Sequence, residues 1–196
     1  MVKRELARGS LWNQWDLHVH TPASFHWPGQ KFESDLTSDQ NRKLVDEMID
    51  AMNKAAPAVF AIMDYWTFDG WLMLQRRLKQ PDAPELKKMV FPGIELRLAA
   101  PMKGRLNAHV LFSNEIEEQA LLDFKSALRI ELVDRPLSNA ALIDLAKQVG
   151  EDKLKVHGFS KADIAASDEK ALKAGAMIAE INPDSYKGAI AKVLNG

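Results

Sequence analysis

"WDLHVHTPASFH", residues 15–26, contains three of the five histidines of the chain. Its first residues alternate between polar and apolar side chains, which predicts a β-strand leading into an irregular segment over residues 21–37. Residues two apart on a strand project from the same face, so Asp16, His18 and His20 are expected to lie in one row. Three explanations compete for such a row: a metal site, a nucleophile–base pair, or ordinary packing.

Composition restricts the classes of protein to which the chain can belong. It has 196 residues, 46% of them hydrophobic and 27% charged, which is typical of one globular domain. A net charge of -1 provides no overall basic field for nucleic acid. The absence of cysteine excludes disulfides, a cysteine nucleophile and a thiolate zinc site. Without a secretory signal or an apolar run of about 18 residues, the sequence predicts a soluble, cytoplasmic protein without a membrane partner.

Apolar runs alternate with amphipathic segments along the chain. After the first strand, we expect strands within residues 57–64, 87–98 and 105–113, and helices within residues 39–55, 68–79, 117–132 and 138–150. This alternation predicts βαβ units, and therefore an α/β fold with a mostly parallel sheet or barrel. The C-terminal residues, 188–196, are expected to form a helix that turns toward another strand. That strand would place part of the domain beyond residue 196.

Polar side chains also occur inside or just after the later strands. Asp64 ends the apolar run "VFAIMD", Glu95 follows "FPGI", and His109 lies within "NAHVLF". Sites in α/β proteins gather at the carboxyl ends of parallel strands. Imidazole nitrogens and carboxylate oxygens suit zinc, manganese or iron. Each residue alone would more often be a capping acid or a core histidine, but their coincidence on several strands favours the metal site.

These motifs resemble a known superfamily. "DLHVHT" (16–21), an acid after an apolar strand, "PGIE" (92–95) and "HVL" (109–111) are similar to the early motifs of the PHP (polymerase and histidinol phosphatase) superfamily. The resemblance covers roughly residues 12–112. The wider segment "RGSLWNQWDLHVHTPAS" (8–24) is similar to PHP modules at the N-termini of bacterial ATPases related to SMC and AAA proteins.

The resemblance implies a single PHP-like domain over residues 1–196, built as a distorted (β/α)7 barrel. It also implies two or three divalent metal ions at the carboxyl ends of the strands, and hydrolysis of phosphoesters. Carried over position by position, it gives these roles: paired ligands on the first strand, His18 and His20; a loop ligand, His26; a bridging carboxylate, Glu95; a further ligand, His109; and the acid of the second motif, Asp64. Asp16 and Asp64 would be the catalytic residues, and Asp16 would act by orienting a ligand imidazole through its other nitrogen.

The chain departs from the superfamily pattern at two places. Tyr65 follows the second-motif acid where a histidine is usual, and the late Asp-x-His pair is absent. His157 is the one late histidine and a weaker candidate ligand, while Glu180 and Asp184 are carboxylates that could substitute. Either the late motifs lie beyond residue 196, or the site is reduced.

Two hypotheses of different class follow. The first is a metal-dependent phosphoesterase that uses Zn, Mn or Fe. One form of this hypothesis is a nuclease that acts on nucleic acid or a nucleotide. The second is a catalytically degenerate PHP-like module that serves as an interaction or regulatory domain for an ATPase domain or subunit. A metal-dependent amidohydrolase on a similar barrel also begins with H-x-H, but "PGIE" and the lack of a candidate carbamylated lysine disfavour it.

Overall fold

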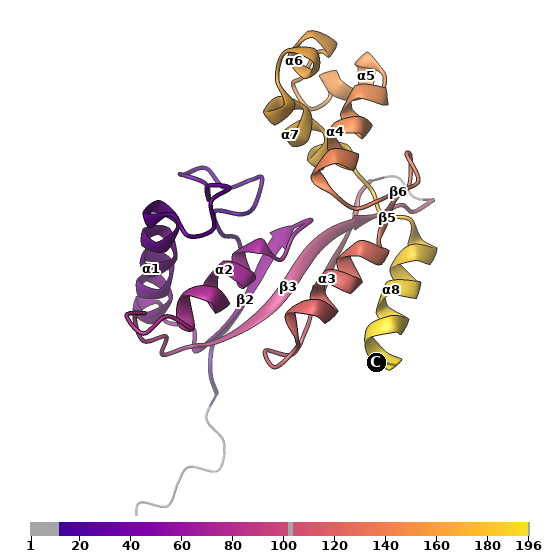
Figure 1. Cartoon of the computed structure of the whole chain (residues 1–196). Helices are drawn as coiled ribbons and strands as arrows, with labels where there is room; N and C mark the ends of the chain where they lie inside the picture. The colour runs from indigo at the N-terminus through magenta and orange to yellow at the C-terminus, as the bar shows by residue number, and fades with distance from the viewer. Residues whose placement is uncertain (1–11, 102–103, 196) are drawn as a thin grey trace, which may run out of the picture.

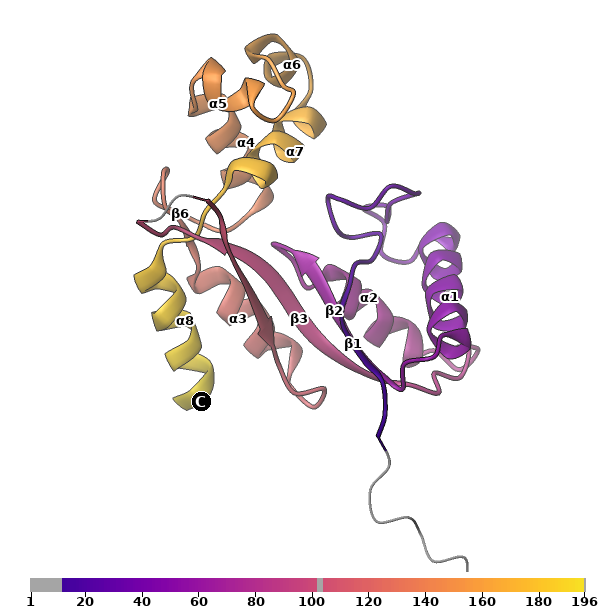
Figure 2. The ribbon, with the colours of Figure 1, turned by 180° about the vertical axis from the view of Figure 1, so that it is seen from behind.

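In a computed structural model, which describes residues 12–101 and 104–195, four strands form one curved sheet in the order β1-β2-β3-β4 (Figures 1 and 2). Their bounds are β1 Trp15–Val19, β2 Val59–Tyr65, β3 Met89–Leu98 and β4 Leu106–Leu111. The first three strands are parallel, and β4 is antiparallel to β3. Residues 8–11 of the segment similar to ATPase-linked modules lie outside the described residues.

The helices divide into two groups. One face of the sheet is covered by α1 Asp39–Lys54, α2 Asp69–Leu78, α3 Glu118–Ala127 and α8 Pro183–Asn195, and Figure 2 shows the opposite face without helices in front of it. The second group, here called the helical lobe, comprises α4 Asn139–Gln148, α5 Glu151–Lys155, α6 Lys161–Ala166 and α7 Asp168–Ile178. The lobe stands beyond the carboxyl end of β3 (Figure 1). None of the described helices combines the length and apolar character needed to span a membrane.

The predicted mostly parallel sheet is confirmed, with β4 as its one antiparallel strand among the described residues. A parallel pair needs a crossover of about a dozen residues or more, whereas β3 ends at Leu98 and β4 already begins at Leu106, an interval in sequence too short for a crossover. The α/β class and the parallel pairing of β1, β2 and β3 are confirmed. The curved four-stranded sheet is consistent with part of a barrel, and a closed seven-stranded barrel stays a prediction.

The predicted helix over residues 39–55 is confirmed as α1, and its local chemistry explains its position. The Ser38 hydroxyl accepts a hydrogen bond from the backbone N–H of Asn41, which caps the first turn. Val45, Ile49 and Met52 recur at helical spacing and are buried against the sheet.

The strand β2, which follows α1 in the chain, is buried on both faces for nearly its whole length, as its continuous apolar sequence indicates.

The predicted helix over residues 117–132 is too long. The helix α3 ends at Ala127, and the chain continues as the short strand β5 Arg129–Ile130, which pairs with β6 Arg135–Pro136. Backbone groups of residues 129–131 also bond to residues 180–182, where Ile181 bridges Ile130 and Leu98. Tertiary pairing therefore overrides the helical periodicity of this segment.

Candidate metal centre

The strand register brings candidate ligands together on the open face of the sheet. Glu95 of β3 pairs with Tyr65 of β2 and with His109 of β4, so the three side chains project from one face. His18 comes from β1, where the pairing with β2 shifts between Asp16 and Val19. These residues lie within strands or at their ends, and no helix of the described chain supplies a ligand to the group that they form.

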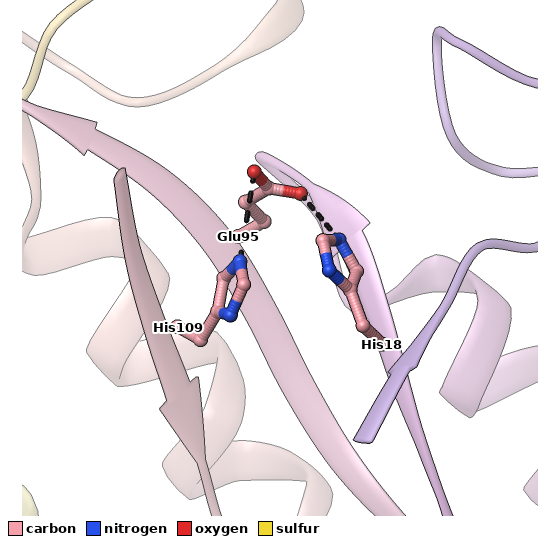
Figure 3. A group of neighbouring side chains, drawn as sticks. All are labelled: His18, Glu95 and His109. Atoms are coloured by element: carbon pink, nitrogen blue, oxygen red, sulfur yellow. Dashed lines mark hydrogen bonds and ion pairs between the residues drawn. The ribbon is translucent and has the colours of Figure 1, made fainter. Parts of the chain in front are cut away.

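Three imidazoles surround the Glu95 carboxylate. His18 Nε2 lies 2.9 Å from Glu95 Oε2, and His109 Nε2 lies 3.6 Å from Oε1, as Figure 3 shows. His20 Nε2 lies 3.6 Å from Oε2. The ligand atoms of His18, Glu95 and His109 are all within 4.8 Å of one another. Asn107 Nδ2 donates to Glu95 Oε1 at 2.9 Å and fixes the carboxylate from the side.

The burial of Glu95 and the partial burial of His20 favour the forms that bind metal, while the His18 and His109 rings are exposed. Glu95 is only 1% exposed, and a buried carboxylate needs a compensating cation or donors. Burial, followed by the neighbouring His18, lowers the pKa of His20, which favours the neutral imidazole that ligates metals. His20 Nδ1 is buried and has no hydrogen-bond partner among the described residues. The donor set of His18, Glu95 and His109 fits a divalent cation, and His20 Nε2, 3.6 Å from Glu95 Oε2, is a fourth candidate donor, whereas the orphaned Nδ1 of His20 lies toward Asp64.

Asp64 lies next to the ligand cluster without belonging to it, and it fastens the loop after β1 to β2. Its Oδ1 accepts from the backbone N–H of Thr21 at 2.7 Å, and its Oδ2 accepts from the Thr21 hydroxyl at 2.6 Å. A Cβ on Gly70 would lie 2.2 Å from both Asp64 Oδ2 and Thr21 Oγ1, so this contact requires glycine at the start of α2. Burial raises the pKa of Asp64 to about 7, although the two hydrogen bonds from Thr21 act in the opposite direction. His20 Nδ1 is 3.9 Å from Asp64 Oδ1, which makes Asp64 a neighbour of the cluster.

The raised pKa of Asp64 predicts a pH dependence of stability. The folded chain retains this proton up to about pH 7, whereas the unfolded chain releases it near pH 3.8, so the contribution of Asp64 to stability falls as pH rises through this window. Relative to Asp64→Asn, which is neutral at every pH, the wild-type free energy of unfolding should fall by about 1 kcal/mol or more from pH 5 to pH 7. Urea unfolding of both chelator-treated proteins at several pH values measures this difference. A difference that is constant or rises with pH would contradict it.

Three other predicted site residues have different neighbours. The Asp16 carboxylate accepts from the backbone N–H of His18 at 3.2 Å, so its partner in the structure is the strand backbone instead of a ligand imidazole. The His26 ring packs on Phe25, with ring centroids 4.1 Å apart, outside the ligand cluster. His157 Nε2 lies 3.0 Å from Arg105 Nη2, also outside it.

Tyr65 occupies the position beside the cluster where the superfamily pattern has a histidine. Its ring stacks on His20, with centroids 5.4 Å apart and an interplanar angle of 9°. Burial, followed by the nearby Glu95 carboxylate, raises the pKa of the phenol. The following residue, Trp66, has a φ of 64°, a left-handed conformation that is costly for a bulky side chain. Trp66 Nε1 donates to the Ala176 carbonyl at 3.0 Å, which helps to hold this turn against the helical lobe.

Sequence reasoning missed three residues of this region: Thr21, Arg97 and Asn107. Asn107 and Arg97 each stand two residues from a predicted ligand, in "NAH" and "ELR", so strand periodicity alone places them on the same face. The importance of Thr21 follows only from its contact with Asp64, 43 positions away in sequence.

Comparisons with known proteins add little about the activity. No protein-family model matches the sequence, and the search of curated proteins found no match either. Among solved structures, the chain is similar to an amidohydrolase from Chromobacterium violaceum that was solved with bound sulfate and no metal. The TM-score is 0.41 at 17% sequence identity, and the match covers 84% of this chain and 49% of that one. The chain thus spans about half the length of that protein, and a likeness of this size does not indicate a shared activity.

Proposed function

We propose that the chain is a metal-dependent hydrolase of phosphoesters, of the PHP type. The observation that carries the proposal is the convergence of three imidazoles on one buried carboxylate, Glu95, at the open face of the sheet. His18, His20, Glu95 and His109 would hold the metal, with Zn, Mn or Fe as the ions that suit such ligands. The motifs "DLHVHT" and "PGIE" support phosphoesters as the substrate class.

The residues of the site have distinct roles in this proposal. A divalent ion bound here would supply a water of lowered pKa and would polarise a phosphoryl oxygen. Asn107 holds the Glu95 carboxylate in place by its hydrogen bond. Tyr65 keeps its phenolic proton at neutral pH, as any tyrosine does and all the more because burial raises its pKa, so it can donate a hydrogen bond at the edge of the cluster.

A cavity that has Tyr65 in its wall, but none of the four candidate ligands, provides room for the organic part of a substrate. Its volume is about 560 Å³, and its walls include the aromatic rings of Phe25, Phe32 and Tyr65. Aromatic side chains are the usual stacking partners of nucleobases, which supports a nucleotide or a nucleic-acid strand as the substrate. Tyr65 belongs to both the cavity wall and the row of strand residues that contains Glu95.

Hydrolysis assays test this proposal. The chain, supplied with Zn, Mn or Fe, is incubated with an aryl phosphomonoester, an aryl phosphodiester, a single-stranded oligonucleotide and an N-acyl amino acid as the amide control. We expect hydrolysis of at least one phosphoester, loss of activity with a chelator, and recovery when metal is returned. Hydrolysis of the amide alone, or phosphoester hydrolysis that is unaffected by chelation, would contradict the proposal.

A second function is a PHP-like module without catalysis that regulates an ATPase domain or subunit. Two observations favour it: Tyr65 fills a position where the superfamily pattern has a ligand, and His157 contacts Arg105 instead of the cluster. This alternative predicts less than one bound metal per chain, no turnover of any of the four substrates, and a change in the rate of ATP hydrolysis by the partner when the chain is added.

A further inference from the structure

Arg97 is a buried cation beside the ligand cluster. It lies two residues beyond Glu95 on β3, so both side chains project from the open face, roughly 7 Å apart along the strand. Its cross-strand partner is Asn107, the residue that bonds to Glu95. Only 3% of Arg97 is exposed, and this burial lowers the pKa of its guanidinium, but an arginine still stays charged at neutral pH because its ordinary pKa lies far above 7.

Arg97 forms no direct ion pair with a carboxylate of the described chain, although the nearby Glu95 carboxylate acts on it electrostatically. Nη1 donates to the carbonyls of Ala176 and Met177, at 2.9 and 2.7 Å, near the C-terminal end of α7. The guanidinium carbon lies 5.1 Å from the ring centroid of Tyr65 and 5.9 Å from that of Trp66. Within the described part of the chain, no carboxylate comes within 4.0 Å of the guanidinium nitrogens. Carbonyls and rings offset part of the cost of burial, and an anion is the partner that a buried cation lacks.

Arg105 adds a second cation on the same side. It lies just before β4, two residues from Asn107, so strand periodicity places it on the face that carries Arg97. Arg105 is exposed, and its Nη2 contacts His157 of the helical lobe at 3.0 Å. Within the described residues it has no carboxylate at ion-pair distance either.

We propose that Arg97, with Arg105 at the rim, forms an anion subsite that holds a phosphate group of the substrate next to the ligand cluster. A guanidinium presents its donors as a planar fork that matches phosphate oxygens. The hydrogen bonds from Arg97 to the lobe carbonyls come from Nη1 alone, so its other nitrogens do not bond to these carbonyls. The nature of the substrate rests on the function proposed above, whereas phosphate binding itself depends on the two arginines.

Titration of inorganic phosphate into the protein as purified, followed by calorimetry at low ionic strength, tests the subsite. The variants are Arg97→Lys, Arg97→Gln and Arg105→Gln, with Arg129→Gln as the matched control because Arg129 is a surface residue paired with Asp134. Metal content and the melting temperature are determined on the same samples. Arg97→Lys retains a charge and donors for the two lobe carbonyls, and Arg105→Gln alters an exposed side chain, so these variants test binding even if Arg97→Gln does not fold.

We expect the dissociation constant for phosphate to rise at least about tenfold in Arg97→Gln, several-fold in Arg97→Lys and several-fold in Arg105→Gln. The control should bind phosphate as the wild type does, and metal content should be the same in all variants. Phosphate affinity that is unchanged in Arg97→Lys and Arg105→Gln would overturn the subsite. If metal content and phosphoester turnover persisted in that case, the proposed function would stand without it.

Discussion

Replacing Glu95 by glutamine is expected to abolish tight metal binding and to lower any metal-dependent hydrolysis by at least about a hundredfold, because loss of even an outer partner of a metal ligand costs tenfold to a hundredfold. Three imidazole nitrogens face the Glu95 carboxylate, so its negative charge is the feature that all candidate ligands share. Glutamine has nearly the same shape and can keep the hydrogen bond from Asn107, so the fold should be retained. Metal titration followed by calorimetry, together with the hydrolysis rate, measures the effect.

Glu118→Gln is the control for this substitution. Glu118 is exposed on α3 and pairs with Arg76, and because it also lines the cavity assigned above to the substrate, it is the control for metal affinity alone, which should be unchanged. Circular dichroism verifies that both variants are folded. Metal affinity in Glu95→Gln equal to that of the control would mean that the cluster is not a metal site.

Replacing Gly175 by alanine is expected to destabilise the helical lobe by about 2–3 kcal/mol, the usual cost of overpacking a tight contact. Gly175 of α7 faces Leu142 of α4, and an added Cβ would lie 1.9 Å from the Leu142 carbonyl oxygen. That atom belongs to the backbone of another helix, so α4 and α7 would have to move apart. The lobe supplies the carbonyls of Ala176 and Met177 to Arg97, so this separation should also disturb the site.

Gly188→Ala provides the comparison, because Gly188 lies in helix α8 and its added Cβ meets no heavy atom within 4 Å. Alanine there should stabilise the chain by about 0.5–1 kcal/mol through its higher helix propensity. Urea unfolding gives both free energies, and amide hydrogen exchange locates the loss in residues 139–178. Equal effects of the two substitutions would show that α4 and α7 are not in close contact.

Much of the fold follows from sequence periodicity. The alternation in "DLHVH", the continuous apolar run of β2 and the capped helix after Ser38 each have a local cause, and each lies where it was expected. Two features depend on contacts that are distant in sequence. The direction of β4 depends on a short connection, and the early end of α3 depends on pairing between residues 129–131 and 180–182.

The candidate site, like the fold, has some features that follow from local sequence and others that depend on contacts distant in sequence. His18, His20, Glu95 and His109 converge because strand parity and register bring them to one face, and their spacing in sequence already suggests this. The separate role of Asp64 could not be predicted, because a carboxylate that fastens a loop has the same sequence context as one that binds metal. The surroundings of Arg97 depend on the packing of the helical lobe on the sheet, which no local pattern specifies.

The most direct test of the central claim is elemental analysis of the purified protein, expressed as metal equivalents per chain, for the wild type and for the double variant His18→Ala, His20→Ala. We expect at least one equivalent of a divalent transition metal in the wild type and its loss in the double variant, because both histidines face Glu95. Substoichiometric metal that is the same in both proteins would contradict the claim that the strand row beginning in "DLHVHT" forms a metal centre.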